Sequence, residues 1–539
     1  MMRRATLPIL VLVTLCWGLA TRAASPVEVA VRVDAAIRAL PENAEAAYAP
    51  PITDDAFLRR GMLDAWGRVP RVDEVAEFRV GTQADKRPRT VERLVGDERF
   101  GRNVAGYWRD TILSRRLEER AMRVADPLVN DLADWINAGE GWDQIATRFI
   151  TATGTADENG ATAIIMAQDG RTEEIAAEVS RLFLGVQIQC AQCHDHPWDS
   201  WKREEFHELA AFFPRVGARQ VKGSKPRTFQ VVVNDRPDKP RFRNGNNVNR
   251  RGRPEHYMAD LERPEEPATR IQPRFFLTGF QRPIGATDEA RRYGLAEELV
   301  QNEWFARAIV NRVWTELIGE GFYDTVDDIG PERSAVAETV LVELTAGFVE
   351  SGYRLKWLYR TVMLTDAYAR ESRPADRVDE GIMMATVAQP LRAEPLLDSL
   401  MAVLGSPRGA DAKQQRKVRN QALRAVNEAF GFDPSEPREN VVGTIPQSLM
   451  LMNSPVLARR ASARTGSMLD KLIDRHTSGD RIDHDAALAE LFDRTLTRPP
   501  TESELAAARR HVAEARRPQA VYEDVLWSLL NTAEFSHRR

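Results

Sequence analysis

The amino-acid sequence predicts a mainly α-helical fold, with two helical domains joined by an irregular connector that holds a few short strands. Apolar residues recur at helical spacing through both halves of the chain, whereas proline and glycine recur in the stretch 215–285. The 539 residues also exceed what one hydrophobic core usually serves. We therefore expect a helical domain over 25–214, the connector over 215–285 and a second helical domain over 286–539.

Residues 1–24 have the pattern of a secretory signal peptide. Arg3 and Arg4 precede an apolar run from Leu7 to Ala20, and small residues follow it. The run is shorter than the roughly 20 residues that a membrane-spanning helix needs. We therefore expect an exported protein, periplasmic or extracellular, with no membrane span in the mature chain.

Two helices are predicted to flank the most distinctive motif of the N-terminal domain. The first follows from an apolar stripe with spacings of four, three and four, formed by Ile175, Val179, Leu182 and Val186. The second follows from Phe206, Leu209, Ala210 and Phe213. Such stripes are the core faces of helices, and the first helix runs up to Cys190.

The connector is basic and irregular. Between residues 215 and 253 it holds twelve Lys or Arg residues against Asp235 and Asp238, and its strand-like runs are Phe229–Val233 and Phe275–Leu277. A solvated loop is the simpler interpretation. The alternative is a docking surface for a periplasmic redox partner or an anionic polymer, because like charges gathered on one loop speed encounter. The whole chain carries a net charge of −4, and we expect no nucleic-acid partner.

Helical stripes continue in the C-terminal domain, at Phe305, Ile309 and Val313 and again at Val336, Val340, Leu344 and Phe348. The sequence lacks the short signatures of serine hydrolases, zinc proteases and nucleotide-binding proteins. Asp327 and Asp328 could bind a cation or act in acid–base chemistry, but two carboxylates in a loop usually belong to a turn.

The motif Cys190-Ala-Gln-Cys193-His194 has the order of residues that attaches a c-type haem. Two thiols separated by two residues can bond the two vinyl groups, and the histidine that follows can bind the iron from one face. The predicted export would bring the chain to the compartment in which such haems are attached. We therefore expect haem c on Cys190 and Cys193, with His194 as the proximal ligand.

Two other interpretations of the cysteines stay open. In the first, the thiolates join His194, His196 or His207 around zinc or iron, since thiolate and imidazole ligands at short spacing can hold a metal. In the second, the cysteines form a structural or redox-active disulfide. If a haem is present, its sixth ligand could be His256 or Met258.

Further motifs lie along most of the chain. One set comprises Phe57–Asp64, Val69–Phe78, Phe100–Trp108, Cys190–Trp198 and Leu209–Phe213. A second set comprises Trp304–Trp314, Val326–Asp328, Phe348–Tyr353, Pro446–Asn453 and Leu526–Asn531. Together they resemble a cytochrome-associated pair of domains described from planctomycete-type genomes, in which domain of unknown function 1549 is followed by domain of unknown function 1553.

The resemblance implies a large exported protein whose activity is unassigned. The cytochrome label of the family rests largely on the same Cys/His motif. Many relatives carry a separate cytochrome domain at the N-terminus, whereas only about 25 residues lie between the predicted signal peptide and Ile52. Any haem is therefore expected at Cys190 and Cys193.

The sequence thus predicts an exported c-type haem protein that exchanges electrons with a periplasmic partner. One alternative is a metal-site protein with a hydrolase or polymer-processing role. Another is a non-catalytic binding protein with a disulfide between Cys190 and Cys193.

Overall fold

The computed structural model describes residues 24–113, 119–238, 253–373, 381–405, 412–436, 450 and 455–539. Apart from Ala24, the predicted signal peptide lies outside the described residues. So do five of the basic residues of the connector, between Lys239 and Arg251. Among the residues that are described, no helix combines the length and the apolar character that crossing a membrane requires.

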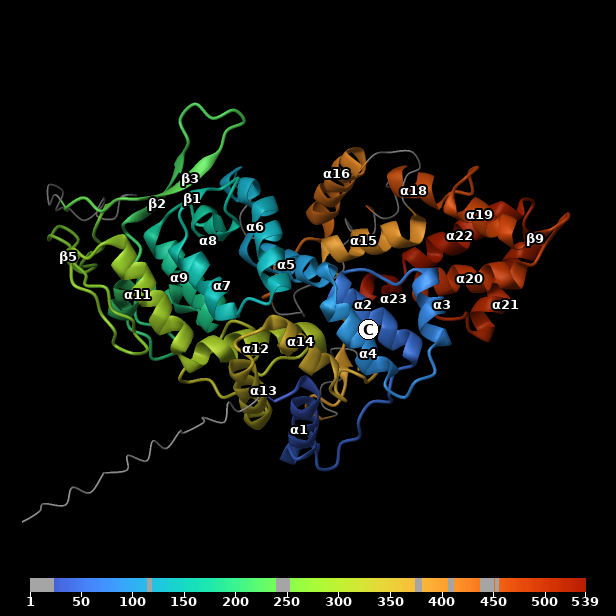
Figure 1. Cartoon of the computed structure of the whole chain (residues 1–539), viewed down its shortest axis with the longest axis horizontal. Coiled ribbons are helices and arrows are strands. Elements are labelled where there is room, and N and C mark those ends of the chain that lie inside the picture. Colours follow the sequence, from blue (N-terminus) through green and yellow to red (C-terminus); the bar gives the residue numbers. More distant parts are fainter. Residues whose placement is uncertain are drawn as a thin grey trace, which may run out of the picture.

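The mainly α-helical fold is confirmed (Figure 1). The helices that precede the connector are α1 (Pro26–Arg38), α2 (Asp54–Trp66), α3 (Val72–Val80), α4 (Lys86–Gly96), α5 (Glu98–Leu113), α6 (Glu119–Ala138), α7 (Trp142–Thr151), α8 (Ala163–Ala167), α9 (Thr172–Leu184) and α10 (Arg203–Ala210). Short 3₁₀ turns lie at η1 (Pro41–Asn43), η2 (Gly160–Thr162) and η3 (Ile188–Gln192).

The helices that follow the connector are α11 (Asp288–Gln301), α12 (Glu303–Ile318), α13 (Glu338–Glu350), α14 (Leu355–Met363), α15 (Ala393–Leu404), α16 (Ala412–Phe430), α18 (Pro455–Ala461), α19 (Met468–Arg475), α20 (His484–Leu496), α21 (Glu502–Glu514), α22 (Pro518–Leu530) and α23 (Ala533–Ser536). The predicted stripe that starts at Val336 is part of α13 only from Val340 onward, because that helix begins at Glu338.

The strands form small sheets. The largest has the antiparallel order β1-β3-β2, with strands β1 (Gly154–Thr155), β2 (Val216–Gln220) and β3 (Phe229–Val233). The other pairs are β4 (Tyr257–Met258) with β5 (Thr269–Arg270), β6 (Ser372–Arg373) with β7 (Thr386–Val387), β8 (Gln389–Pro390) with β11 (His537–Arg538), and β9 (Thr477–Ser478) with β10 (Arg481–Ile482).

Of the two strands predicted in the connector, only one exists. The run Phe229–Val233 is β3, but Phe275–Leu277 is not a strand. Phe275 is fully buried, its amide donates to the carbonyl of Phe280 at 2.7 Å, and the amide of Gly279 returns to the Phe275 carbonyl at 2.8 Å. Gly279 has φ 73, a conformation that suits glycine. The apolar run is therefore a buried turn.

The described residues pack around two hydrophobic cores. The first contains buried residues from Val29 to Met384, and so joins α11–α14 to the helices before the connector. The second runs from Leu391 to Phe535, with Leu63 and Val69 added from the N-terminal region. The two cores therefore divide between Met384 and Leu391.

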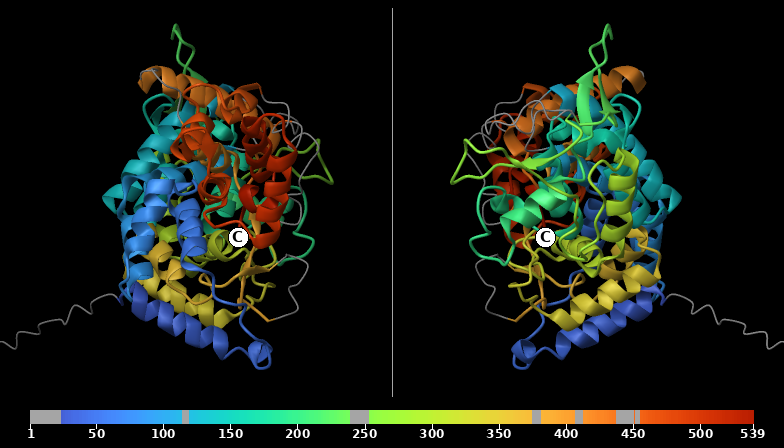
Figure 2. Two further views of the ribbon diagram at one scale, coloured as in Figure 1. Left: turned by 90° about the vertical axis from the view of Figure 1, so that its right-hand side faces the viewer. Right: turned by 90° about the vertical axis from the view of Figure 1, so that its left-hand side faces the viewer.

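Contacts between residues far apart in the sequence join the helices of the second core to those of the first. In Figure 1, α18–α22 lie together on the right of the molecule, beside α3. Arg79 of α3 pairs with Asp493 of α20 at 2.6 Å. The hairpin of β2 and β3 projects at the opposite end, and the two views of Figure 2 show its tip standing clear of the helices.

Candidate functional site

Helix α9 precedes the Cys/His motif in the chain and is capped at its C-terminus by a glycine. Gly185 has φ 67, and a β-carbon there would lie 2.8 Å from Cδ1 of Ile329. The amide of Ile329 also donates to the Gly185 carbonyl at 2.8 Å. Both the left-handed conformation and the close approach suit a residue without a side chain. The turn that follows α9 is thereby fixed against the second half of the chain.

The two cysteines lie on and just after the 3₁₀ turn η3. Ile188 and Ala191 of this turn are fully buried, whereas Cys190 and Cys193 are exposed and free. The buried residues hold the turn to the core while both thiols face solvent. The structure thus places both cysteines where a large group could reach them.

His194 is exposed and has one ring nitrogen engaged. Its Nδ1 lies 2.6 Å from the carbonyl oxygen of Asp195, so in the neutral imidazole Nδ1–H donates to that carbonyl. Its Nε2 has no hydrogen bond among the described residues. Histidines that bind metals commonly donate the other ring N–H to a carbonyl, which fixes the tautomer and orients the ring. Nε2 is therefore the nitrogen available to an iron atom.

Asp195 ties this loop to the start of α10. Its carboxylate accepts from Lys202 Nζ at 2.9 Å and from the backbone amide of Arg203 at 3.1 Å. The hydrogen bond from Lys202, and then that from the Arg203 amide, lower the pKa of Asp195. The carboxylate stays ionised and caps a helix N-terminus, where negative charge is favoured.

Residues from the second half of the chain support the same loop. Trp201 is buried edge-to-face against Phe276 and Trp304, with ring centroids 5.0 and 5.7 Å apart. Arg333 donates to the Trp198 carbonyl at 3.2 Å. At Gly330, a β-carbon would lie 2.0 Å from Oδ2 of Asp199. Trp198 itself is 76% exposed beside the motif.

His207 and His256 form a buried pair that reaches the motif. Nδ1 of His207 lies 2.8 Å from Nε2 of His256, and Nε2 of His207 lies 3.1 Å from the Gln192 carbonyl. A carbonyl only accepts, so Nε2 of His207 carries the proton and Nδ1 accepts from His256. Nδ1 of His256 then carries no proton. It has no hydrogen-bond partner among the described residues, and Glu173 lies 3.9 Å away.

Both histidines of this pair are held neutral. Burial, and to a smaller extent the Arg203 cation, lower the pKa of His207 to about 4. Burial and the neighbouring His207 lower the pKa of His256 well below its ordinary value. The backbone around His256 is anchored by Glu255, whose carboxylate accepts from the buried Arg291 at 2.7 Å.

The remaining candidate ligands are His196 and Met258. His196 is half-buried, and its Nδ1 lies 3.4 Å from the Trp198 amide that donates to it. Met258 is half-buried in β4, opposite Thr269 of β5. Within the described residues, no group of three or more His, Cys, Asp or Glu side chains is arranged to hold a metal ion.

A buried ion cluster formed by Arg181 of α9, Arg312 of α12 and Asp327 is a feature that the sequence did not predict. Asp327 accepts from Arg181 at 2.8 Å and from Arg312, and both arginines donate to Ser435 Oγ, at 3.1 and 2.7 Å. Burial lowers the pKa of Arg181, but the carboxylates of Glu178 and Asp327 outweigh it and leave that pKa raised. Asp327 therefore serves as a buried counter-ion of two arginines.

The neighbouring Asp328 lies at the surface. It pairs with Arg333 at 3.0 Å, and both side chains are about a third exposed. Asp327 thus belongs to a buried ion cluster, whereas Asp328 belongs to an ion pair that is accessible to water.

The basic connector also differs from a simple solvated loop. Arg215 is buried and pairs with Glu255 at 2.8 Å and with Asp235 at 3.3 Å. Arg227 is exposed and pairs with Glu119 at 3.0 Å. Within the described part of residues 215–253, the cations that face solvent are Arg219, Lys222, Lys225, Arg227 and Arg236.

Two family models match the chain, one before and one after residues 219–290. A model described as a protein of unknown function (DUF1549) matches residues 32–218, and one described as a protein of unknown function (DUF1553) matches residues 291–429. The chain belongs to the family that carries these two domains in this order. No curated protein and no solved structure matches it.

Proposed function

We propose that the chain is an exported c-type haem protein that exchanges electrons with a periplasmic partner. Cys190 and Cys193 would hold the haem through thioether bonds, and Nε2 of His194 would bind its iron. The observation that carries the proposal is the arrangement of the loop: both thiols are free and exposed, and His194 has only Nδ1 engaged. A haem bound there would supply one-electron transfer at its iron.

The donor set of the loop fits a haem better than a bare metal ion. A c-type haem needs two accessible thiols and one imidazole, and the motif offers these three groups. A structural zinc site needs four ligands at once. His207 has both ring nitrogens engaged in its contacts with Gln192 and His256. It would have to give up one of these contacts to become a ligand.

The protein environment of the loop suits electron exchange with a partner. The motif lies at the surface, so a cofactor attached there would be accessible to a second protein. Asp195 and Trp201 fix the loop from two sides, which limits its movement during exchange. A rigid loop keeps the iron ligand in one orientation in both oxidation states.

The projecting hairpin between β2 and β3 is the proposed docking element. It carries Arg219, Lys222, Lys225 and Arg227 on or beside its exposed tip. A cluster of like charge on a projecting segment attracts an acidic redox partner or an anionic polymer. Such binding should weaken steeply as salt rises from about 0.05 to about 0.5 M. Salt-insensitive binding would contradict a charge-based role for the hairpin.

Haem staining of denaturing gels tests the proposal in a host that contains the cytochrome c assembly factors. The wild-type polypeptide should stain, and the double variant Cys190→Ala, Cys193→Ala should not. The matched control is His196→Ala, which removes a neighbouring imidazole and should still stain. An unstained wild-type band of the correct mass, produced beside a stained control cytochrome, would contradict the proposal.

The same preparations separate the alternatives. Elemental analysis that finds one zinc or iron per chain without porphyrin would support the metal-site interpretation, and His196→Ala would then lower the metal content. Oxidised cysteines in a chain with neither metal nor porphyrin would support the disulfide. Each of these results excludes attached haem.

A further inference from the structure

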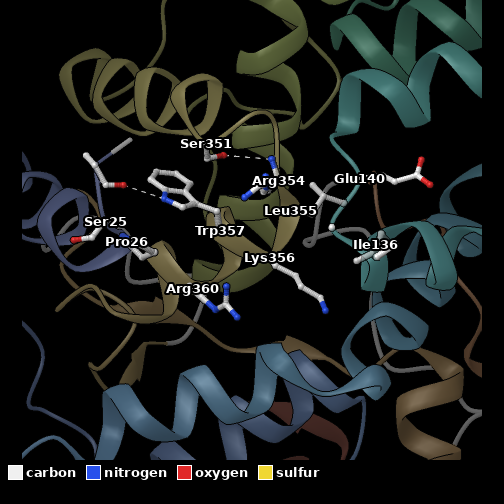
Figure 3. A pocket seen from close by; sticks show the side chains of 13 residues that line it. Ser25, Pro26, Ile136, Glu140, Ser351, Arg354, Leu355, Lys356, Trp357 and Arg360 are labelled. Atoms are coloured by element: carbon white, nitrogen blue, oxygen red, sulfur yellow. Dashed lines mark hydrogen bonds between the residues drawn. The ribbon is translucent and has the colours of Figure 1, made fainter. Parts of the chain in front are cut away.

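A cavity of about 550 Å³ lies where the start of α1, the end of α6 and the start of α14 meet (Figure 3). Its volume lies within the range of small-molecule sites. Trp357, Leu355 and Ile136 form apolar parts of the wall. The rest of the wall is mainly polar and basic.

Three cations line this cavity: Arg354, which precedes α14, and Lys356 and Arg360 of α14. Two of them have no carboxylate partner among the described residues. Arg360 pairs with Glu92 at 2.8 Å. Lys356 Nζ donates to the Asn137 carbonyl at 3.3 Å, and the Arg354 guanidinium has no hydrogen bond or ion pair within the described part of the chain.

The acidic side chain in the wall does not neutralise them. Glu140 pairs with Arg148 at 2.8 Å. Burial, and then the Arg360 cation, lower the pKa of Lys356, and the smaller opposing effects of Asp97 and Glu92 do not offset this lowering. Lys356 and Arg360 are four residues apart and so lie on one side of the helix, as Figure 3 shows.

We propose that this cavity binds the phosphate group of a small organic ligand between Arg354 and Lys356. Two cations that lack carboxylate partners match a group with two negative charges. The planar fork of an arginine and the compact ammonium of a lysine are both common phosphate donors. The cavity is far larger than a phosphate ion, and the apolar surface of Trp357 and Leu355 suits the organic part of the ligand. The site is independent of haem.

Calorimetric titration of the purified protein with inorganic phosphate tests the proposal. Sulfate, which has the same shape and charge, should compete with phosphate. Acetate and chloride at the same ionic strength should not. Arg354→Gln and Lys356→Gln should each weaken phosphate binding by about tenfold or more. Lys471→Gln on α19 removes the same charge from an exposed position that belongs to no proposed site, and its phosphate affinity should stay within about twofold of wild type.

A second measurement uses the unaltered protein. Phosphate should protect Lys356 from an amine-acylating reagent, as followed by peptide mass spectrometry, while Lys471 reacts at an unchanged rate. Absence of saturable phosphate binding, equal binding of acetate, or equal loss of affinity in the Lys471 variant would overturn the proposal. Retained affinity in both the Arg354 and the Lys356 variant would overturn it as well.

Discussion

Replacing Asp327 by Asn should destabilise the first core strongly. Asp327 is 2% exposed and receives hydrogen bonds from two arginines whose side chains are 8% and 2% exposed. Asn keeps one acceptor oxygen but removes the charge, so Arg181 and Arg312 would keep a buried excess of positive charge. Removing one partner of a buried ion pair typically costs about 3–5 kcal/mol. Arg181 keeps its ion pair with Glu178 at 2.5 Å, so the expected loss in the free energy of unfolding is about 3 kcal/mol, at the lower end of this range.

Urea unfolding followed by tryptophan fluorescence measures this loss, because the Arg312 guanidinium lies 5.2 Å from the ring centre of Trp108 in the first core. The matched control is Asp328→Asn. Its pair with Arg333 is partly exposed, and an exposed ion pair contributes about 0–1 kcal/mol. A loss below about 1 kcal/mol for Asp327→Asn, or equal losses for the two variants, would refute the assignment of Asp327 as a buried counter-ion.

Three further predictions concern titration and backbone geometry. Burial raises the pKa of Asp34 from 3.8 to about 6, so the folded state favours the protonated carboxyl. The stabilisation of the folded state by this proton is complete below about pH 4 and is lost as the pH rises through 6, which lowers the free energy of unfolding by up to about 3 kcal/mol. Asp34→Asn should therefore gain stability relative to wild type between about pH 4 and about pH 7, and a constant difference would contradict this. Burial lowers the pKa of His207 from 6.5 to about 4, so the folded state favours the neutral imidazole. The contribution of His207 to the free energy of unfolding is therefore complete above about pH 7 and falls by about 2 kcal/mol by about pH 5. His207→Gln should flatten that slope in urea titrations, and an unchanged slope would show that other groups cause it. Gly185→Ala should lower the free energy of unfolding by about 1–2 kcal/mol, because φ 67 and the contact with Ile329 both oppose a β-carbon; wild-type stability would contradict the strain.

The sequence predicted the helices around the motif well, because their apolar periodicity is a local property. Ile175, Val179 and Leu182 lie on the buried face of α9, but this helix ends at Leu184, before Val186 and Cys190. Phe206, Leu209 and Ala210 are buried in α10, which ends before Phe213. The run at Phe275–Leu277 failed as a strand because a short apolar run has no period that separates a strand from a buried turn. The run forms a turn because Phe280 and Gly279, which lie after it in the sequence, make the hydrogen bonds that close the turn.

The contacts between distant segments were beyond sequence reasoning. Arg181 and Asp327 are 146 residues apart, and Arg181 and Ser435 are 254 apart. No spacing rule relates such positions. The pairing of His207 with His256 has the same origin, since β4 must first fold back toward α10. The division of the buried residues into two cores near residue 390 likewise results from packing between distant segments, which composition does not show.

The central claim is that a haem is covalently attached at Cys190 and Cys193, and the reduced pyridine haemochrome spectrum of the purified protein tests it most directly. Attachment through two thioether bonds predicts the absorption of a c-type haemochrome, at one haem per chain, that stays with the polypeptide after acidified acetone extraction. A colourless chain, or a haem that the solvent removes, would contradict the claim.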